Sequence, residues 1–234
     1  MSELAAYQFN PPVGVIRMDD GKANALSPEM LRDINAALDR AMIDQAVVVL
    51  SGRDGRFSAG FDLNVLGAGG PAAINLLRAG FETAERLLSF PTPVVMACTG
   101  HTIAMGLFLL LSGDYRVGGS GDYKLTANEV AIGLTMPQSA IEICRQRLTP
   151  AALTRVVNLA EVFAPDQAVA AGILDRVVES SKLEEVTRDT AVRLAALDMR
   201  AHAATKLRAR APALTALRAA IAADDAALRG QSQP

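Results

Sequence analysis

The hydrophobic residues near the start of the chain follow two different periods. Across Val13–Met18, apolar and polar residues alternate and β-branched residues are frequent, a pattern that predicts a strand. After Ser27 and Pro28, the period changes to an apolar residue at every third or fourth position. Serine just before a helix and proline at its first position both favour helix formation. We therefore expect a helix that begins at Pro28 and ends near Ile43.

Further along, short apolar runs alternate with longer amphipathic segments. The runs are short enough to be strands buried on both faces, and the longer segments have helical spacing. The expected elements are strands at 47–50, 94–98 and 115–117 and helices at 74–88 and 104–112. Glycines in 52–56 and at Gly100 predict a loop and a turn between them.

Beyond Thr149-Pro150, which again suit a helix start, the chain reads as mostly helical. The expected helices are 151–161, 165–171, 183–197 and 201–228. Strand–helix alternation followed by helices is typical of an α/β core that carries a helical C-terminal part. No stretch reads as a flexible linker, so we expect a single core.

The composition is that of a globular chain. Of its 234 residues, 50% are hydrophobic and 21% are charged, a balance that allows a large core to be buried. The formal net charge is −2, and the lysines and arginines are scattered along the chain. They do not form the basic stripe that binds nucleic acid, so we expect no nucleic-acid partner.

Two features bear on the compartment. Cys98 and Cys144 are the only cysteines and lie in apolar contexts, which indicates reducing surroundings, and the first residues do not resemble a secretory signal. Between Arg86 and Asp114 no other charged residue occurs, but prolines and glycines interrupt this stretch too often for a spanning helix. We expect a cytoplasmic protein without a membrane segment.

Two turns that follow buried strands are candidates for ligand contact through main-chain N–H groups. The first is Phe57–Leu63, where Gly60 permits close approach. The second is 99–106, where a strand ends and an apolar helix begins. Unpaired N–H groups at a helix start suit a developing oxyanion. For the first segment alone, an ordinary turn with Asp62 as a helix cap is the simpler interpretation.

Glu129 is the candidate catalytic acid. The residues that follow it are apolar, and apolar surroundings disfavour the charged carboxylate, which raises its pKa toward the range useful for proton transfer. From the pattern alone, a solvated or salt-bridged glutamate at the end of a strand remains the alternative.

Taken in order, these segments resemble the crotonase (enoyl-CoA hydratase/isomerase) superfamily from Val13 to Val178. The similar segments are GKANAL at 21–26, FSAGFD at 57–62, GHTIAMGLFLLLSGD at 100–114, NEVAIGLTMP at 128–137 and AAGILDRVV at 170–178. The resemblance implies an α/β fold, with a crotonase-like ββα spiral core over residues 1–180. It also implies a C-terminal helical oligomerisation region over residues 181–234.

The resemblance further implies roles for single residues. The main-chain N–H groups of Ala59 and Met105 match the family's donors to a thioester oxygen, and Glu129 matches a family acid. Residues implied to contact the acyl-CoA substrate, the first three in the adenine pocket, are Lys22, Ala23, Ala25, Phe57, Phe61, Leu63 and Phe108. Lys206 or Arg208 would meet a phosphate across a subunit contact. The implied partners are an acyl-CoA thioester and copies of the chain in a homotrimer or dimer of trimers, with no metal and no cofactor beyond the substrate's coenzyme A.

Two departures from the family pattern restrict which reactions we expect. Hydratases of this family use two glutamates to hold and activate water, and here Phe108 stands where the second would be. Gln138-Ser139-Ala140 replaces a glycine-rich turn. Phenylalanine cannot orient water, so we expect isomerisation of a 3-enoyl-CoA to a 2-enoyl-CoA with Glu129 as the single acid/base. The alternatives are hydration of an enoyl-CoA despite the loss of the second glutamate, or a CoA-thioester-binding subunit without catalysis.

Two other kinds of chemistry find less support in the residues. Cys98 and His101 sit three positions apart, and a thiol–imidazole pair can act as a nucleophile. Because Cys98 closes an apolar strand and His101 falls in a turn, structural roles are favoured. Two histidines without clustered Cys–His spacing argue against a zinc site.

Overall fold

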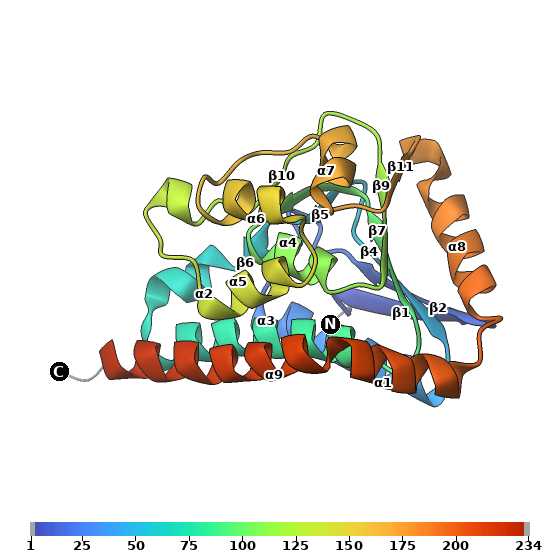
Figure 1. Ribbon diagram of the computed structural model, residues 1–234, viewed down its shortest axis with the longest axis horizontal. Helices are drawn as coiled ribbons and strands as arrows, with labels where there is room; N and C mark the ends of the chain where they lie inside the picture. The colour runs from blue at the N-terminus through green and yellow to red at the C-terminus, as the bar shows by residue number, and fades with distance from the viewer. Residues whose placement is uncertain (1–2, 232–234) are drawn as a thin grey trace.

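The computed structural model describes residues 3–231, which form a mixed α/β fold around one large sheet (Figure 1). Within those residues the sheet has six strands in the order β1-β2-β4-β7-β9-β11, and only β1 is antiparallel to its neighbour. The strands are β1 (Ala5–Asn10), β2 (Val13–Met18), β4 (Val47–Ser51), β7 (Val94–Cys98), β9 (Tyr115–Gly119) and β11 (Arg176–Val178). The strands predicted at 13–18, 47–50, 94–98 and 115–117 are confirmed.

Five shorter strands form two smaller sheets beside the large one. β5 (Gly55–Ser58), β8 (Gly100–Ile103) and β10 (Leu125–Thr126) pair in parallel, and β3 (Ala25–Leu26) pairs with β6 (Gly60–Phe61). The prediction of a loop at 52–56 and a turn at Gly100 is therefore wrong in part, because strands begin at residues 55 and 100. These strands are too short to give a periodic signal, and distant pairing alone forms them.

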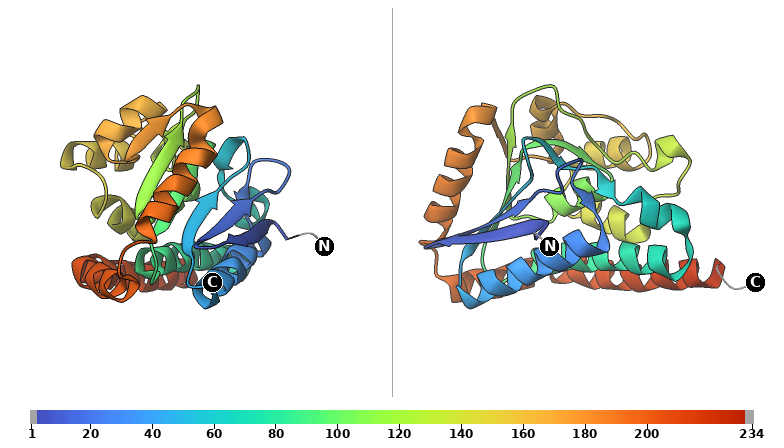
Figure 2. Two further views of the ribbon diagram at one scale, coloured as in Figure 1. Left: turned by 90° about the vertical axis from the view of Figure 1, so that its right-hand side faces the viewer. Right: turned by 180° about the vertical axis from the view of Figure 1, so that it is seen from behind.

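Helices cover both faces of the large sheet (Figure 2). α1 (Pro28–Ile43), α3 (Gly70–Ser89) and α4 (Met105–Leu111) pack on one face in the main core, where Ile16, Leu50 and Met96 are fully buried. α8 (Leu183–Leu194) lies on the other face in a smaller cluster. The remaining helices are α2 (Leu63–Ala68), η1 (Val130–Ile132), α5 (Gln138–Arg145), α6 (Pro150–Val157), α7 (Pro165–Ala171), η2 (Ser180–Lys182) and α9 (Met199–Gln231).

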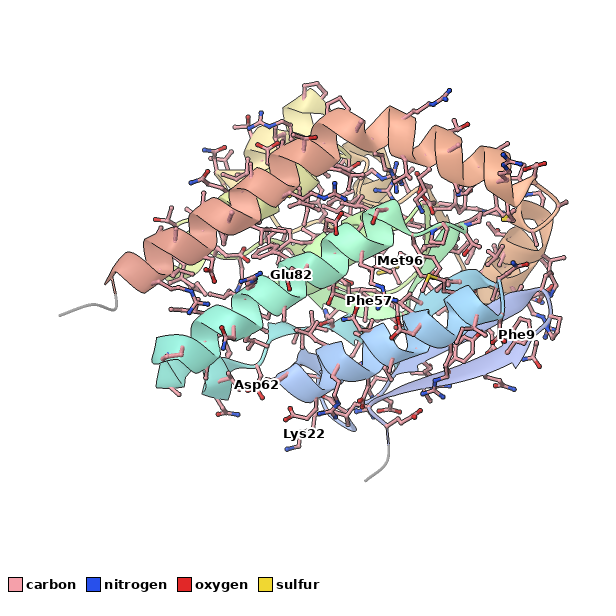
Figure 3. All side chains as sticks on the ribbon, turned by 90° about the horizontal axis from the view of Figure 1, so that it is seen from below. Phe9, Lys22, Phe57, Asp62, Glu82 and Met96 are labelled. Atoms are coloured by element: carbon pink, nitrogen blue, oxygen red, sulfur yellow. The ribbon has the colours of Figure 1, made fainter. Side chains whose placement is uncertain are left out.

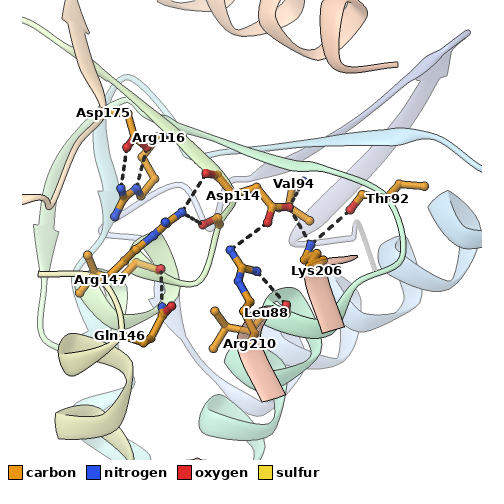
Figure 4. A network of polar contacts seen from close by, with 12 residues as sticks. Leu88, Thr92, Val94, Asp114, Arg116, Gln146, Arg147, Asp175, Lys206 and Arg210 are labelled. Carbon is orange, nitrogen blue, oxygen red and sulfur yellow. Dashed lines mark hydrogen bonds and ion pairs between the residues drawn. The ribbon is translucent and has the colours of Figure 1, made fainter. Parts of the chain in front are cut away.

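The long helix α9 runs along α3 and α5 (Figure 1). An ion-pair cluster fastens it to the sheet (Figure 4): Lys206 Nζ donates to Asp114 Oδ2 at 2.7 Å, and Arg210 lies 2.9 Å from the same carboxylate. Lys206 is buried, so the prediction that it meets a substrate phosphate is wrong. Arg208 is exposed, and its predicted role is untested. No helix within residues 3–231 is long and apolar enough to cross a membrane.

Candidate active site

The N–H group of Ala59, predicted to bind a thioester oxygen, is already engaged. It donates a hydrogen bond to the main-chain oxygen of Ala23 at 3.0 Å. Just after these two residues in the chain, β3 pairs in parallel with β6, and Ala25 lies opposite Gly60. The prediction for Ala59 is therefore wrong, because the pairing of two distant segments consumes this donor.

The next N–H group of this segment that can point away from β3 is that of Phe61. Its neighbour Asp62 donates to the main-chain oxygen of Leu26 at 3.3 Å, so the Asp62 amide points toward β3. Successive residues of an extended strand direct their amides to opposite sides. The Phe61 N–H group therefore points away from β3 and is the donor that this turn offers.

Phe61 lies directly against the turn that carries Met105. Gly60 has φ +90°, and a Cβ atom placed on it would lie 3.0 Å from Ala104 Cβ and 3.4 Å from Met105 N. Ala104, at φ +50°, turns the chain into α4 and donates its own N–H to the Thr126 oxygen at 2.9 Å. Met105 begins the helix, where an N–H group has no intrahelical partner. The two turns thus bring the amides of residues 61 and 105 together.

Asn24 connects the predicted adenine-pocket segment to this turn. Its side chain is fully buried, and Nδ2 donates to the main-chain oxygens of Met18 at 2.9 Å and Phe57 at 3.2 Å. The Ser58 hydroxyl donates to the Asn24 oxygen at 2.7 Å. Residues 22–25 are therefore fixed beside residues 57–60. Within the segment, the Lys22 side chain projects into solvent (Figure 3).

Glu129 lies beside the same turns. It follows β10, whose Thr126 pairs with Ile103 in β8, and it immediately precedes η1. Its Oε2 atom is buried and has no hydrogen-bond partner among the described residues. Burial raises the pKa of the Glu129 carboxyl above its ordinary value. The Oε2 atom is therefore withdrawn from bulk water and the pKa is raised as expected, although the apolar residues Val130 and Ile132 are themselves exposed.

Cys144 of α5 is one of the groups near Glu129. Burial, and then the negative charge of Glu129, raise the pKa of the Cys144 thiol. Helix α5 packs against α4, which begins with Met105. Glu129 therefore lies close enough to act electrostatically on α5, the helix that packs against α4.

Three phenylalanines form a stack behind the two amides. The Phe61 and Phe81 rings are 6.2 Å apart in an edge-to-face arrangement, and the Phe81 and Phe108 rings are 6.3 Å apart and stacked. Phe108 is 1% exposed, so it is a packing residue in a dry environment and, contrary to the prediction, does not present its side chain to an accessible substrate pocket. No carboxylate stands at this position to hold water.

Two of the predicted substrate contacts differ sharply in exposure. Phe57 is completely buried in the main core (Figure 3), so its side chain does not reach an accessible pocket surface, contrary to the prediction. Leu63 is 76% exposed at the start of α2, and its contact with substrate stays a prediction. Asp62 caps this helix by accepting from the Asn64 N–H group at 2.8 Å, in agreement with the simpler interpretation of the segment.

Cys98 and His101 each have a different partner. The Cys98 thiol lies 3.2 Å from the Thr102 hydroxyl, and burial raises its pKa, which disfavours the nucleophilic thiolate. His101 Nδ1 accepts from the Lys124 N–H group at 3.0 Å. This arrangement supports structural roles for both.

A cavity of about 650 Å³ lies between α8 and the face of the large sheet remote from α4. Val13, Val49 and Ala97 are among its lining residues, and none of the predicted site residues lines it. The chemistry that the amides and Glu129 can perform is therefore separate from this cavity.

The sequence also matches a known family. The profile of the enoyl-CoA hydratase/isomerase family matches residues 8–232. The chain therefore belongs to the enoyl-CoA hydratase/isomerase family, a family of enzymes, and the predicted crotonase fold is confirmed. The human peroxisomal bifunctional enzyme is 33% identical over 190 residues, 79% of this chain but only 25% of that protein. The chain thus spans about a quarter of the length of this relative.

Among the similar solved structures, some are named enoyl-CoA isomerases and others enoyl-CoA hydratases. An enoyl-CoA isomerase of Mycobacterium tuberculosis is 48% identical with a TM-score of 0.93, over 97% of this chain and 99% of that one. Another structure from this organism, also 48% identical, is named a probable enoyl-CoA hydratase. An enoyl-CoA hydratase of Mycobacterium marinum is 47% identical with a TM-score of 0.92, over 95% and 98%. These names alone do not separate isomerisation from hydration, so the residues of the site must do so.

Proposed function

We propose that this protein isomerises 3-enoyl-CoA thioesters to 2-enoyl-CoA thioesters, with Glu129 as its single acid/base. The observation that carries the proposal is the combination of one carboxyl, whose buried Oε2 atom has no hydrogen-bond partner among the described residues, with a phenylalanine at the second acid's position. Hydration needs groups that hold and activate a water molecule, whereas moving a double bond needs one base that takes a proton and returns it.

In the proposed reaction, the thioester oxygen accepts hydrogen bonds from the main-chain N–H groups of Phe61 and Met105. The Glu129 carboxylate removes a proton from C2, and the electrons of that bond move onto the thioester oxygen to give a dienolate. The protonated Glu129 then returns the proton to C4, and the double bond forms between C2 and C3. Each amide stabilises the charge that develops on the oxygen.

The dry surroundings support the same assignment. Burial disfavours the charged form of the Glu129 carboxyl, so its carboxylate is a stronger base than a solvated one. The aromatic stack of Phe61, Phe81 and Phe108 keeps water from the region behind the amides, which protects a dienolate from side reactions. The reaction needs no cofactor beyond the coenzyme A of the substrate.

Binding of the coenzyme A moiety is proposed for the segment that Asn24 fixes beside the amides. Lys22 is exposed there, and Arg53 donates to the Lys22 main-chain oxygen at 3.0 Å. These two cations suit a phosphate-bearing ligand. Ala23 and Ala25 are half-buried and provide a small, flat surface for the adenine.

An ultraviolet assay with short enoyl-CoA thioesters tests the proposal. The wild type should convert a 3-enoyl-CoA, and Glu129→Gln, which keeps the side chain's shape but not its basicity, should lose at least about 100-fold in kcat. Glu185→Gln is the matched control, since Glu185 lies on α8 in an exposed ion pair with Lys182.

Three outcomes would contradict the proposal in different ways. Tight CoA-thioester binding without turnover would indicate a binding subunit. Rapid hydration of crotonyl-CoA would show that Phe108 does not prevent water activation. Full isomerase activity in Glu129→Gln would remove the carboxylate from the mechanism.

The assembly and the compartment also remain proposals. We propose a homotrimer or a dimer of trimers, as the resemblance implies, and a cytoplasmic setting, which the apolar contexts of Cys98 and Cys144 favour. Light scattering that finds only a particle of 24.6 kDa would contradict the assembly.

A further inference from the structure

Gly80 occupies an unusual position for a glycine. It lies in the middle of α3 and is buried, although glycine is among the poorest helix formers. A Cβ atom placed on it would overlap Cε1 of the Phe61 ring, lie 2.5 Å from Cζ of that ring, and lie 3.6 Å from Cε of Met105. Gly80 therefore packs against the side chains of both residues whose amides are the proposed donors.

The Phe61 ring has little freedom to move away from α3. Its edge-to-face partner Phe81 follows Gly80 on the same helix and is 4% exposed, and Phe108 stacks behind Phe81. On the main-chain side, Phe61 belongs to a two-residue strand held by β3. A displacement of the ring is thus transmitted to the short segment that carries the Phe61 amide.

We propose that Gly80 is a positioning residue for the oxyanion hole: the absence of a side chain lets the edge of the Phe61 ring approach α3 closely, which sets where the Phe61 N–H group points. This inference rests on the proposed function. It predicts that a single methyl group at position 80 impairs catalysis even though alanine is the better helix residue. A misplacement of about 1 Å can cost about 100-fold in rate, so Gly80→Ala should lower kcat by about 10- to 100-fold with a smaller change in KM.

A double variant separates this mechanism from general damage. Phe61→Leu removes Cε1 and Cζ, the two ring atoms that the new methyl group would meet, and leaves the main-chain donor in place. Phe61→Leu alone gives the reference kcat for this comparison. Adding Gly80→Ala to Phe61→Leu should then change kcat less than two-fold. Gly230→Ala is the matched control, because Gly230 is an exposed residue of α9 and a methyl group added there would meet no atom within 4 Å.

A spectroscopic readout distinguishes failure of this inference from failure of the proposed function. The absorption of a dimethylaminocinnamoyl-CoA thioester moves to longer wavelength when its carbonyl oxygen accepts strong hydrogen bonds. The wild type should produce the shift, Gly80→Ala should reduce it, and the double variant should recover it. No shift in the wild type would overturn the proposed oxyanion hole.

Two results would overturn the role of Gly80 alone. In the first, the wild type produces the absorption shift, and Gly80→Ala leaves both the shift and kcat at their wild-type values. The other is a large further loss when Gly80→Ala is added to Phe61→Leu, because the damage would then not pass through the Phe61 ring. This second comparison holds even if Gly80→Ala by itself does not fold.

Discussion

Replacing Asp114 with asparagine tests the cluster that fastens α9 to the sheet (Figure 4). The Asp114 carboxylate accepts from Lys206 Nζ and from the Val94 N–H group, both at 2.7 Å, and it lies 2.9 Å from Arg210. The Lys206 side chain is 4% exposed, so water cannot replace the lost carboxylate. Asparagine keeps an acceptor for Val94 but leaves two cations without their counter-charge.

The expected loss follows from what each cation can do. Burial lowers the pKa of Lys206 from 10.5 to about 8 even with Asp114 beside it. Without the Asp114 carboxylate this pKa falls further, so the lysine can lose its proton at small cost, which limits its contribution to the loss of stability. Arg210 cannot lose its proton, and its charge-assisted bond is worth about 1.5–3 kcal/mol. Asp114→Asn should therefore lower the free energy of unfolding by about 3–4 kcal/mol. At this chain length the melting temperature should fall by about 6–15 °C.

Urea denaturation followed by circular dichroism, together with thermal melts at pH 7, measures this loss. Glu185→Gln is again the control, since its exposed ion pair should contribute less than about 1 kcal/mol. The double variant Asp114→Asn/Lys206→Met removes the stranded lysine charge and should regain about 1 kcal/mol over Asp114→Asn. A loss below about 1 kcal/mol in the single variant would refute the role assigned to the cluster.

Two further predictions concern the site. Because burial raises the pKa of Glu129 and the carboxylate is the active form, kcat/KM should fall with decreasing pH at a midpoint above the ordinary 4.5; a pH–rate profile with its midpoint at or below 4.5 would contradict the assignment. Asn24→Ala leaves the buried oxygens of Met18 and Phe57 without their donor, so the free energy of unfolding should fall by about 2–3 kcal/mol and kcat should fall with it. Denaturation and turnover should be measured on one preparation of the variant. If the free energy of unfolding and kcat do not fall together, Asn24 does not hold the site.

The sequence predicts those elements whose signals are local. Helix α1 begins and ends where expected, because the Ser27 hydroxyl accepts from the Met30 N–H group at 3.1 Å and Pro28 occupies the first position. The raised pKa expected for Glu129 is also found, although Val130 and Ile132 are exposed and do not bury it. For α1 the deciding interactions lie within a few residues.

The errors have a common cause in pairing between distant segments. The motif at 57–62 predicts Ala59 as a donor, but the approach of β3 uses its N–H group and leaves that of Phe61. The resemblance offers Lys206 or Arg208 as a contact for a phosphate, but Asp114, 92 positions away, holds Lys206 in the interior. Strands of two residues and single buried ion pairs leave no periodic pattern, so only the folded structure reveals which groups remain free.

A crystal structure with an unreactive acyl-CoA analogue tests the central claim most directly. The thioester oxygen should lie within hydrogen-bond distance, about 2.7–3.2 Å, of both Phe61 N and Met105 N, with the Glu129 carboxylate beside C2 and C4 of the acyl chain. A thioester oxygen bound elsewhere, or a second acid in contact with the acyl group, would contradict it.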